Sequence, residues 1–80
     1  MTREQVELYV RNLPLGDLQG RALRGEEDDR LAEIIDALEA VLEDRRVRFG
    51  GLGRMGPLNP HLSLIETIEI CRNRLENIGR

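Results

Sequence analysis

Residues 31–47 read LAEIIDALEAVLEDRRV, and this stretch decides the fold class of the chain. Its apolar residues recur at intervals of three and four positions, which is the spacing of one face of an α-helix. Acidic residues stand between them and would face water, and the stretch contains no glycine or proline. The residues of the apolar face are Leu31, Ile34, Ile35, Leu38, Val41 and Leu42.

Charged residues at both ends extend this predicted helix to about residues 26–48. Four consecutive acidic residues begin it, and three arginines lie near its end, which suits the dipole of a helix. Gly50 follows and can end the helix in a left-handed conformation.

A short helix is predicted near the N-terminus. Thr2 and Gln5 have the spacing of a capping box, in which each residue satisfies a backbone amide of the other. The helix covers about residues 3–12 and ends before Pro14, because the residue that precedes a proline is pushed out of helical geometry.

A third helix is predicted over about residues 60–78. Asn59 before Pro60 suits its first turn, whereas Ser63 with Glu66 offers a capping box and a later start. Its apolar face holds Leu64, Ile65, Ile68, Cys71, Leu75 and Ile78, and is widened by Leu62 and Ile70.

Two segments join these helices. Residues 14–25 are expected to form a connector, because three glycines weaken a helix there, although Asp17 could begin a brief turn. Residues 49–59 hold four of the eight glycines and form a Gly-rich loop. At eleven residues this loop is longer than the roughly 2–8 residues usual between packed helices.

We therefore predict an all-α fold in a single domain, residues 1–80. A short N-terminal helix accompanies an antiparallel hairpin of the two longer helices. Two helices cannot close a core, and a core of this size supplies only a few kcal/mol of stability. We expect a second copy to complete a helical bundle, which makes the protein a homodimer or a higher homo-oligomer.

The composition restricts the class of partner and the compartment. The net charge of −3 argues against a general nucleic-acid binder, since such proteins carry a basic excess. A single cysteine cannot form an internal disulfide and is typical of a reducing cytoplasm. The chain lacks an apolar run near the roughly 20 residues that span a bilayer, so a cytoplasmic protein without a membrane segment is expected.

The leading functional hypothesis is a small protein–protein interaction or regulatory module. Such a module acts through helix–helix contacts with a protein partner and performs no chemistry of its own. The apolar residues that exceed the needs of a single helical hairpin are the predicted contacts: Val10, Leu13, Leu62 and Ile70.

An alternative is nucleic-acid or phosphate-ligand binding through the Arg/Gly-rich segment 45–54. Backbone amides next to glycines can approach a phosphate, arginines can clamp it, and an aromatic ring can stack on a base. The spacing matches no phosphate-loop motif, and the same arginines could simply complete a helix end. The candidate contacts are Arg45, Arg46, Arg48, Phe49 and Arg54.

A helix–turn–helix motif, with helices over residues 18–24 and 26–48, is a further alternative. It is disfavoured because the second helix would begin with four acidic residues at the end that meets phosphates.

A third alternative is a helical subunit of an enzyme, although no catalytic motif is found. His61 and Cys71 are the only soft metal ligands, and ten residues of helix would place them about 15 Å apart. Glu66 and Glu69 lack the histidine that a di-iron helix supplies. No catalytic residue, metal ligand or cofactor is therefore predicted.

Overall fold

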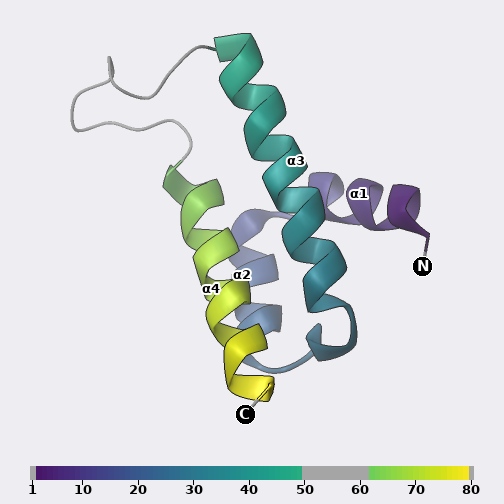
Figure 1. The fold of residues 1–80 in the computed structure, drawn as a ribbon, viewed down its shortest axis with the longest axis vertical. Coiled ribbons are helices and arrows are strands. Elements are labelled where there is room, and N and C mark those ends of the chain that lie inside the picture. The colour runs from purple at the N-terminus through teal and green to yellow at the C-terminus, as the bar shows by residue number, and fades with distance from the viewer. Residues whose placement is uncertain (1, 50–61, 80) are drawn as a thin grey trace.

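The structure is a computed structural model that describes residues 2–49 and 62–79. Over these residues it consists of α-helices, one short 3-10 helix and the turns between them, and this confirms the all-α fold class (Figure 1). The elements are α1 (Arg3–Asn12), α2 (Leu15–Leu23), η1 (Asp28–Arg30), α3 (Leu31–Phe49) and α4 (Leu62–Ile78).

Helix α1 begins and ends where the sequence predicts. The amide of Gln5 donates a hydrogen bond to Thr2 Oγ1 at 3.2 Å, and the amide of Thr2 donates to Gln5 Oε1 at 2.8 Å. The capping box is therefore complete. At the other end Leu13 has extended backbone, as expected for the residue before Pro14.

Residues 15–23, predicted as part of a connector, instead form the helix α2. Leu18 and Ala22 are both fully buried, and α2 packs chiefly against α4. Burying a leucine contributes about 1.5–3 kcal/mol, which offsets the roughly 1 kcal/mol that each glycine costs in a helix. The prediction of a connector was therefore wrong over residues 15–23, because the burial of Leu18 and Ala22 outweighs the cost of the glycines.

Helix α3 begins at Leu31, five residues later than the predicted start at 26. Gly25 has a φ of 81°, a left-handed conformation that ends α2 and reverses the chain. The acidic residues 26–29 consequently lie in the turn and in η1 rather than in the first turn of α3.

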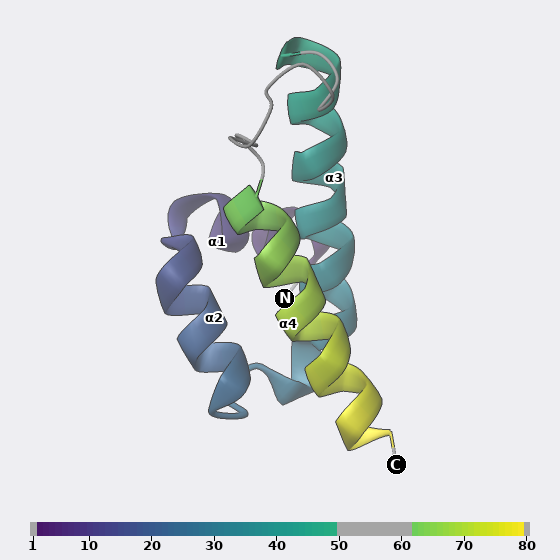
Figure 2. The ribbon, with the colours of Figure 1, turned by 90° about the vertical axis from the view of Figure 1, so that its left-hand side faces the viewer.

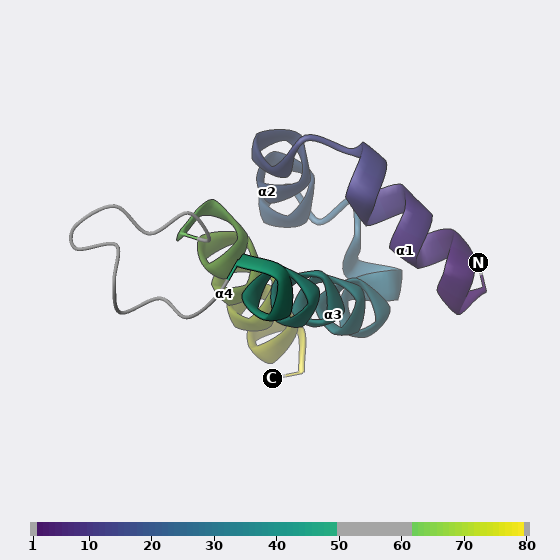
Figure 3. The same ribbon diagram turned by 90° about the horizontal axis from the view of Figure 1, so that it is seen from above.

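Helices α3 and α4 form the predicted antiparallel hairpin, and α1 and α2 lie over one side of it (Figures 2 and 3). Helix α1 packs on α3, while α2 packs on α4. Thr67 at the α2–α4 contact is buried but satisfied: it accepts a hydrogen bond from Gln19 at 2.9 Å and donates to the Ser63 carbonyl at 2.7 Å.

The buried core therefore draws on all four helices of the described part of the chain. Much of the gap that we expected a second copy to fill is covered by α1 and α2 of the same chain. The core residues are Val6, Val10, Leu18, Ala22, Leu31, Ile34, Ile35, Ala37, Leu38, Val41, Leu64, Ile68 and Cys71.

None of the helices in the described segments is both long and apolar enough to cross a membrane.

Candidate functional site

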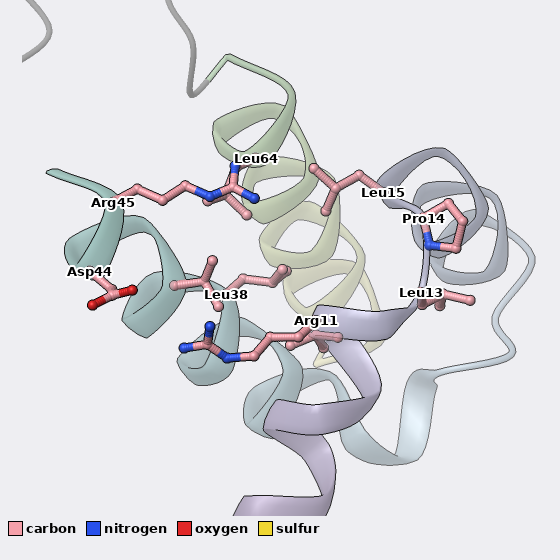
Figure 4. Close-up of a pocket in the computed structure, with 10 residues that line it drawn as sticks. Arg11, Leu13, Pro14, Leu15, Leu38, Asp44, Arg45 and Leu64 are labelled. Carbon is pink, nitrogen blue, oxygen red and sulfur yellow. The ribbon is translucent and has the colours of Figure 1, made fainter. Parts of the chain in front are cut away.

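A cleft of about 360 Å³ lies where α1, α2, α3 and α4 meet (Figure 4). Most of its lining residues are apolar, and its charged residues come from α1 and from the C-terminal half of α3. We call it the four-helix cleft. It is lined by Val10, Arg11, Leu13, Pro14, Leu15, Leu38, Val41, Asp44, Arg45 and Leu64.

Two guanidinium groups reach into the four-helix cleft from different helices. Arg11 extends from α1 and Arg45 extends from α3, and both groups lie over the apolar wall that contains Leu38 and Leu64 (Figure 4). Arg11 is exposed and Arg45 is half-buried. Neither guanidinium forms an ion pair with a carboxylate within the segments described, 2–49 and 62–79.

The structure separates the predicted basic cluster instead of gathering it. Arg45 lines the four-helix cleft, whereas Arg46 lines a different depression between α3 and α4. Neighbouring residues of an α-helix project about 100° apart, and these two arginines accordingly line different depressions. The side chains of Arg48 and Phe49, and all of Arg54, lie outside what the structure describes.

The depression between α3 and α4 is a second candidate surface, here called the α3–α4 groove. It has a volume of about 260 Å³. Leu42 and Ile65 are half-buried on its floor, and charged side chains border it. At one end Arg72 Nη2 lies 2.5 Å from Glu39 Oε2. The lining residues are Glu39, Leu42, Arg46, Ile65, Ile68, Glu69 and Arg72.

The four predicted partner contacts do not share one surface. Val10 is only 4% exposed and belongs to the core, so a partner cannot reach it. Leu13 and Ile70 are partly buried against the core, whereas Leu62 is 49% exposed. On the apolar face of α4, Leu64, Ile68 and Cys71 are buried within the chain, whereas Leu62, Leu75 and Ile78 are exposed.

A buried carboxylate, Glu27, is the polar feature that the sequence does not reveal. Its side chain is fully buried, and its Oε2 accepts hydrogen bonds from the Tyr9 hydroxyl and, at 3.0 Å, from Arg21 Nε. Arg30 Nε lies 3.4 Å from Oε1. Burial, together with the hydrogen bond to Glu27, raises the pKa of Tyr9. Residues from α1, α2 and η1 therefore meet at one acidic group, which joins three elements.

Cys71 is fully buried in the core. Burial, with a smaller effect from the negative charge of Glu27, raises the pKa of its thiol to about 11. In the described parts of the chain, no three histidine, cysteine or acidic side chains are grouped to hold a metal ion. His61, the other predicted soft ligand, is outside those parts.

Comparison of the chain with models of protein families, with curated proteins and with solved structures gives no match in any of the three.

Proposed function

We propose that this protein is a helical protein–protein interaction module. Two copies would associate face to face, with the α3–α4 groove of one copy against the α3–α4 groove of the other. The module performs no chemistry of its own and acts by helix–helix contact. The proposal is supported by the half-buried apolar floor of the groove, which a partner helix would cover. Leu62, 49% exposed, extends the apolar surface at one end of α4.

One observation favours a second copy over an unrelated helix. Glu39 and Arg46 are seven residues apart on α3, so they lie on the same edge of the groove, about two helical turns from each other. Leu42 lies between them on the groove floor.

This edge is complementary to itself. If two α3 helices cross antiparallel about a twofold axis near Leu42, Glu39 of one copy faces Arg46 of the partner subunit, and the reverse pair forms by symmetry. The two leucines then meet at the axis and exclude water. Exposed ion pairs of this kind contribute about 0.2–1 kcal/mol each, so they set the register while apolar burial supplies most of the affinity.

Charge reversal tests this arrangement. In Glu39→Arg the dimer would place two positive charges opposite each other, and in Arg46→Glu it would place two negative charges opposite each other. Each single variant is expected to weaken the dimer by roughly tenfold, because both symmetric pairs are lost. The double variant E39R/R46E restores opposite charges and is expected to recover the dimer. Sedimentation equilibrium over a series of concentrations measures each dissociation constant.

Two controls make the experiment specific. Glu66→Arg changes the net charge by the same amount on an exposed position of α4 outside the groove and should leave the dimer intact. Arg72→Gln removes the partner of Glu39 within the chain and measures what that loss alone does. A wild-type chain that stays monomeric into the submillimolar range, or a double variant no better than the singles, would contradict the proposal.

A further inference from the structure

We infer that the four-helix cleft binds a small amphiphilic anion, with a carboxylate or phosphate head group on a short apolar body. This site is independent of the proposed dimer, because the cleft and the α3–α4 groove share no lining residue.

The apolar body of the ligand would lie on the exposed edge of the core. Leu13 and Leu15 are half-buried and packed against the core, and Pro14 is exposed; these three residues give the cleft its accessible apolar surface, over a floor of buried core side chains. The two leucines are held by core packing on their other sides, so this wall is formed before any ligand arrives. A preformed apolar wall lowers the entropic cost of binding.

The head group is selected by Arg11 and Arg45. Guanidinium groups hold oxyanions through paired, charge-assisted hydrogen bonds. The two groups extend from opposite sides of the cleft (Figure 4), so a head group between them would leave its tail against the half-buried Leu13 and Leu15. This local positive charge stands out in a chain whose net charge is −3.

The third charged group, Asp44, limits where the head group can lie. Asp44 lines the cleft on α3 beside Arg45 and already takes part in an interaction of its own. Its carboxylate repels an anion, so the favourable position is the space between Arg11 and Arg45. Polyphosphates, which carry several more negative charges, are disfavoured for the same reason.

The volume restricts the size of the ligand. About 360 Å³ is at the low end of the roughly 300–1,000 Å³ typical of ligand sites. At about 30 Å³ for each non-hydrogen atom, the cleft holds roughly a dozen of them. A chain of about eight carbons with one oxyanion head group matches this volume.

Four probes separate the contributions of head group and tail: octanoate, octyl phosphate, octanol and acetate. Each is titrated into the intact chain while the methyl signals of Leu38, Val41 and Leu64 are followed by NMR. Octanoate and octyl phosphate are expected to shift these signals in a saturable way. Octanol, without charge, and acetate, without a tail, are each expected to bind about tenfold more weakly or worse. Whether octanoate or octyl phosphate binds more tightly identifies the preferred head group.

Variants locate the site. Arg11→Gln combined with Arg45→Gln should weaken octanoate binding by about tenfold or more. Arg46→Gln removes the adjacent positive charge from the other surface and should leave binding unchanged. Circular dichroism verifies that each variant folds, and the single substitutions are used if the double variant does not. The inference is overturned if the methyl signals do not move, if octanol binds as well as octanoate, or if R46Q weakens binding as much as R11Q/R45Q.

Discussion

Arg74 of α4 donates two parallel hydrogen bonds to Asp28 of η1, from Nε to Oδ1 at 2.9 Å and from Nη2 to Oδ2 at 2.7 Å. This bidentate pair ties the last helix to the turn between α2 and α3. The Arg74 guanidinium holds the pKa of the Asp28 carboxyl below its ordinary value.

The pair predicts a pH-dependent part of the stability. Because the pKa of Asp28 is lowered by folding, the contribution of the pair is present above the pKa of an unfolded aspartate, about 4, and is lost as the pH falls through the lower pKa of the folded state. Arg74→Gln should therefore be less stable than the wild type at neutral pH, and the difference should shrink in acid. Urea unfolding at a series of pH values measures the difference in the free energy of unfolding between the two proteins. A difference that persists fully in strong acid would show that Arg74 acts through packing.

Among the substitutions considered, Glu27→Gln is expected to lower the free energy of unfolding the most. Glu27→Gln removes the negative charge that faces Arg21 and Arg30, and the expected cost is about 2 kcal/mol. This lies below the 3–5 kcal/mol range for breaking a buried pair, because the two arginines are partly exposed and can return to water. Glu26→Gln, at the adjacent exposed position, should change the stability little. Equal effects of the two substitutions in chemical denaturation would contradict the central role of the buried carboxylate.

The ionisation of Tyr9 reports on the same contact. Burial and the hydrogen bond to Glu27 raise the pKa of Tyr9, so its phenol should deprotonate at a higher pH than a free tyrosine. In the Glu27→Gln variant the pKa is expected to fall toward the ordinary value. Ultraviolet absorbance of the single tyrosine during an alkaline titration measures this shift. An unchanged titration curve in the variant would mean that burial alone causes it.

Two glycines should respond in opposite ways to alanine. Gly25 has a φ of 81°, and an added Cβ would come within 2.8 Å of the Arg74 side chain. Gly25→Ala is therefore expected to destabilise the fold by about 1 kcal/mol or more. At Gly16 in α2 an added Cβ would meet nothing within 4 Å, so Gly16→Ala should stabilise the fold by up to about 1 kcal/mol. Thermal unfolding distinguishes the two, and a stable G25A variant would contradict the turn geometry.

Cys71 should be unreactive in the folded protein. Its thiol is buried and has a pKa of about 11, so almost none of it is thiolate at neutral pH. Iodoacetamide is expected to label Cys71 only after the chain is unfolded in denaturant. Mass spectrometry measures the rate at which Cys71 is alkylated. Rapid modification under native conditions would show that the core around α4 opens readily.

The local elements could largely be predicted from the sequence, because their signals lie within a few residues. The spacing of Thr2 and Gln5 gave α1, and the apolar periodicity gave the hairpin of α3 and α4. Helix α2 was considered only within the disfavoured helix–turn–helix alternative, because Leu18 and Ala22 pack chiefly against α4, which lies far along the chain.

The candidate sites were less predictable, because they depend on distant parts of the chain. The sequence groups Arg45 with Arg46, whereas the structure places Arg45 with Arg11 because α1 packs on α3. Nothing in the run 26–29 distinguishes Glu27 from its acidic neighbours. Its burial follows from the turn at Gly25, which turns one carboxylate inward.

The pairing of α2 with α4 has a consequence for synthesis on the ribosome. Helix α2 packs chiefly against a segment that follows it by about forty residues, and α1 depends in the same way on α3. While the chain is being made, α4, which makes most of the contacts with α2, emerges after the other described helices. The apolar faces of α1 and α2 are therefore exposed to water or bound by a chaperone during synthesis. The core of the described helices can form only after α4 has emerged.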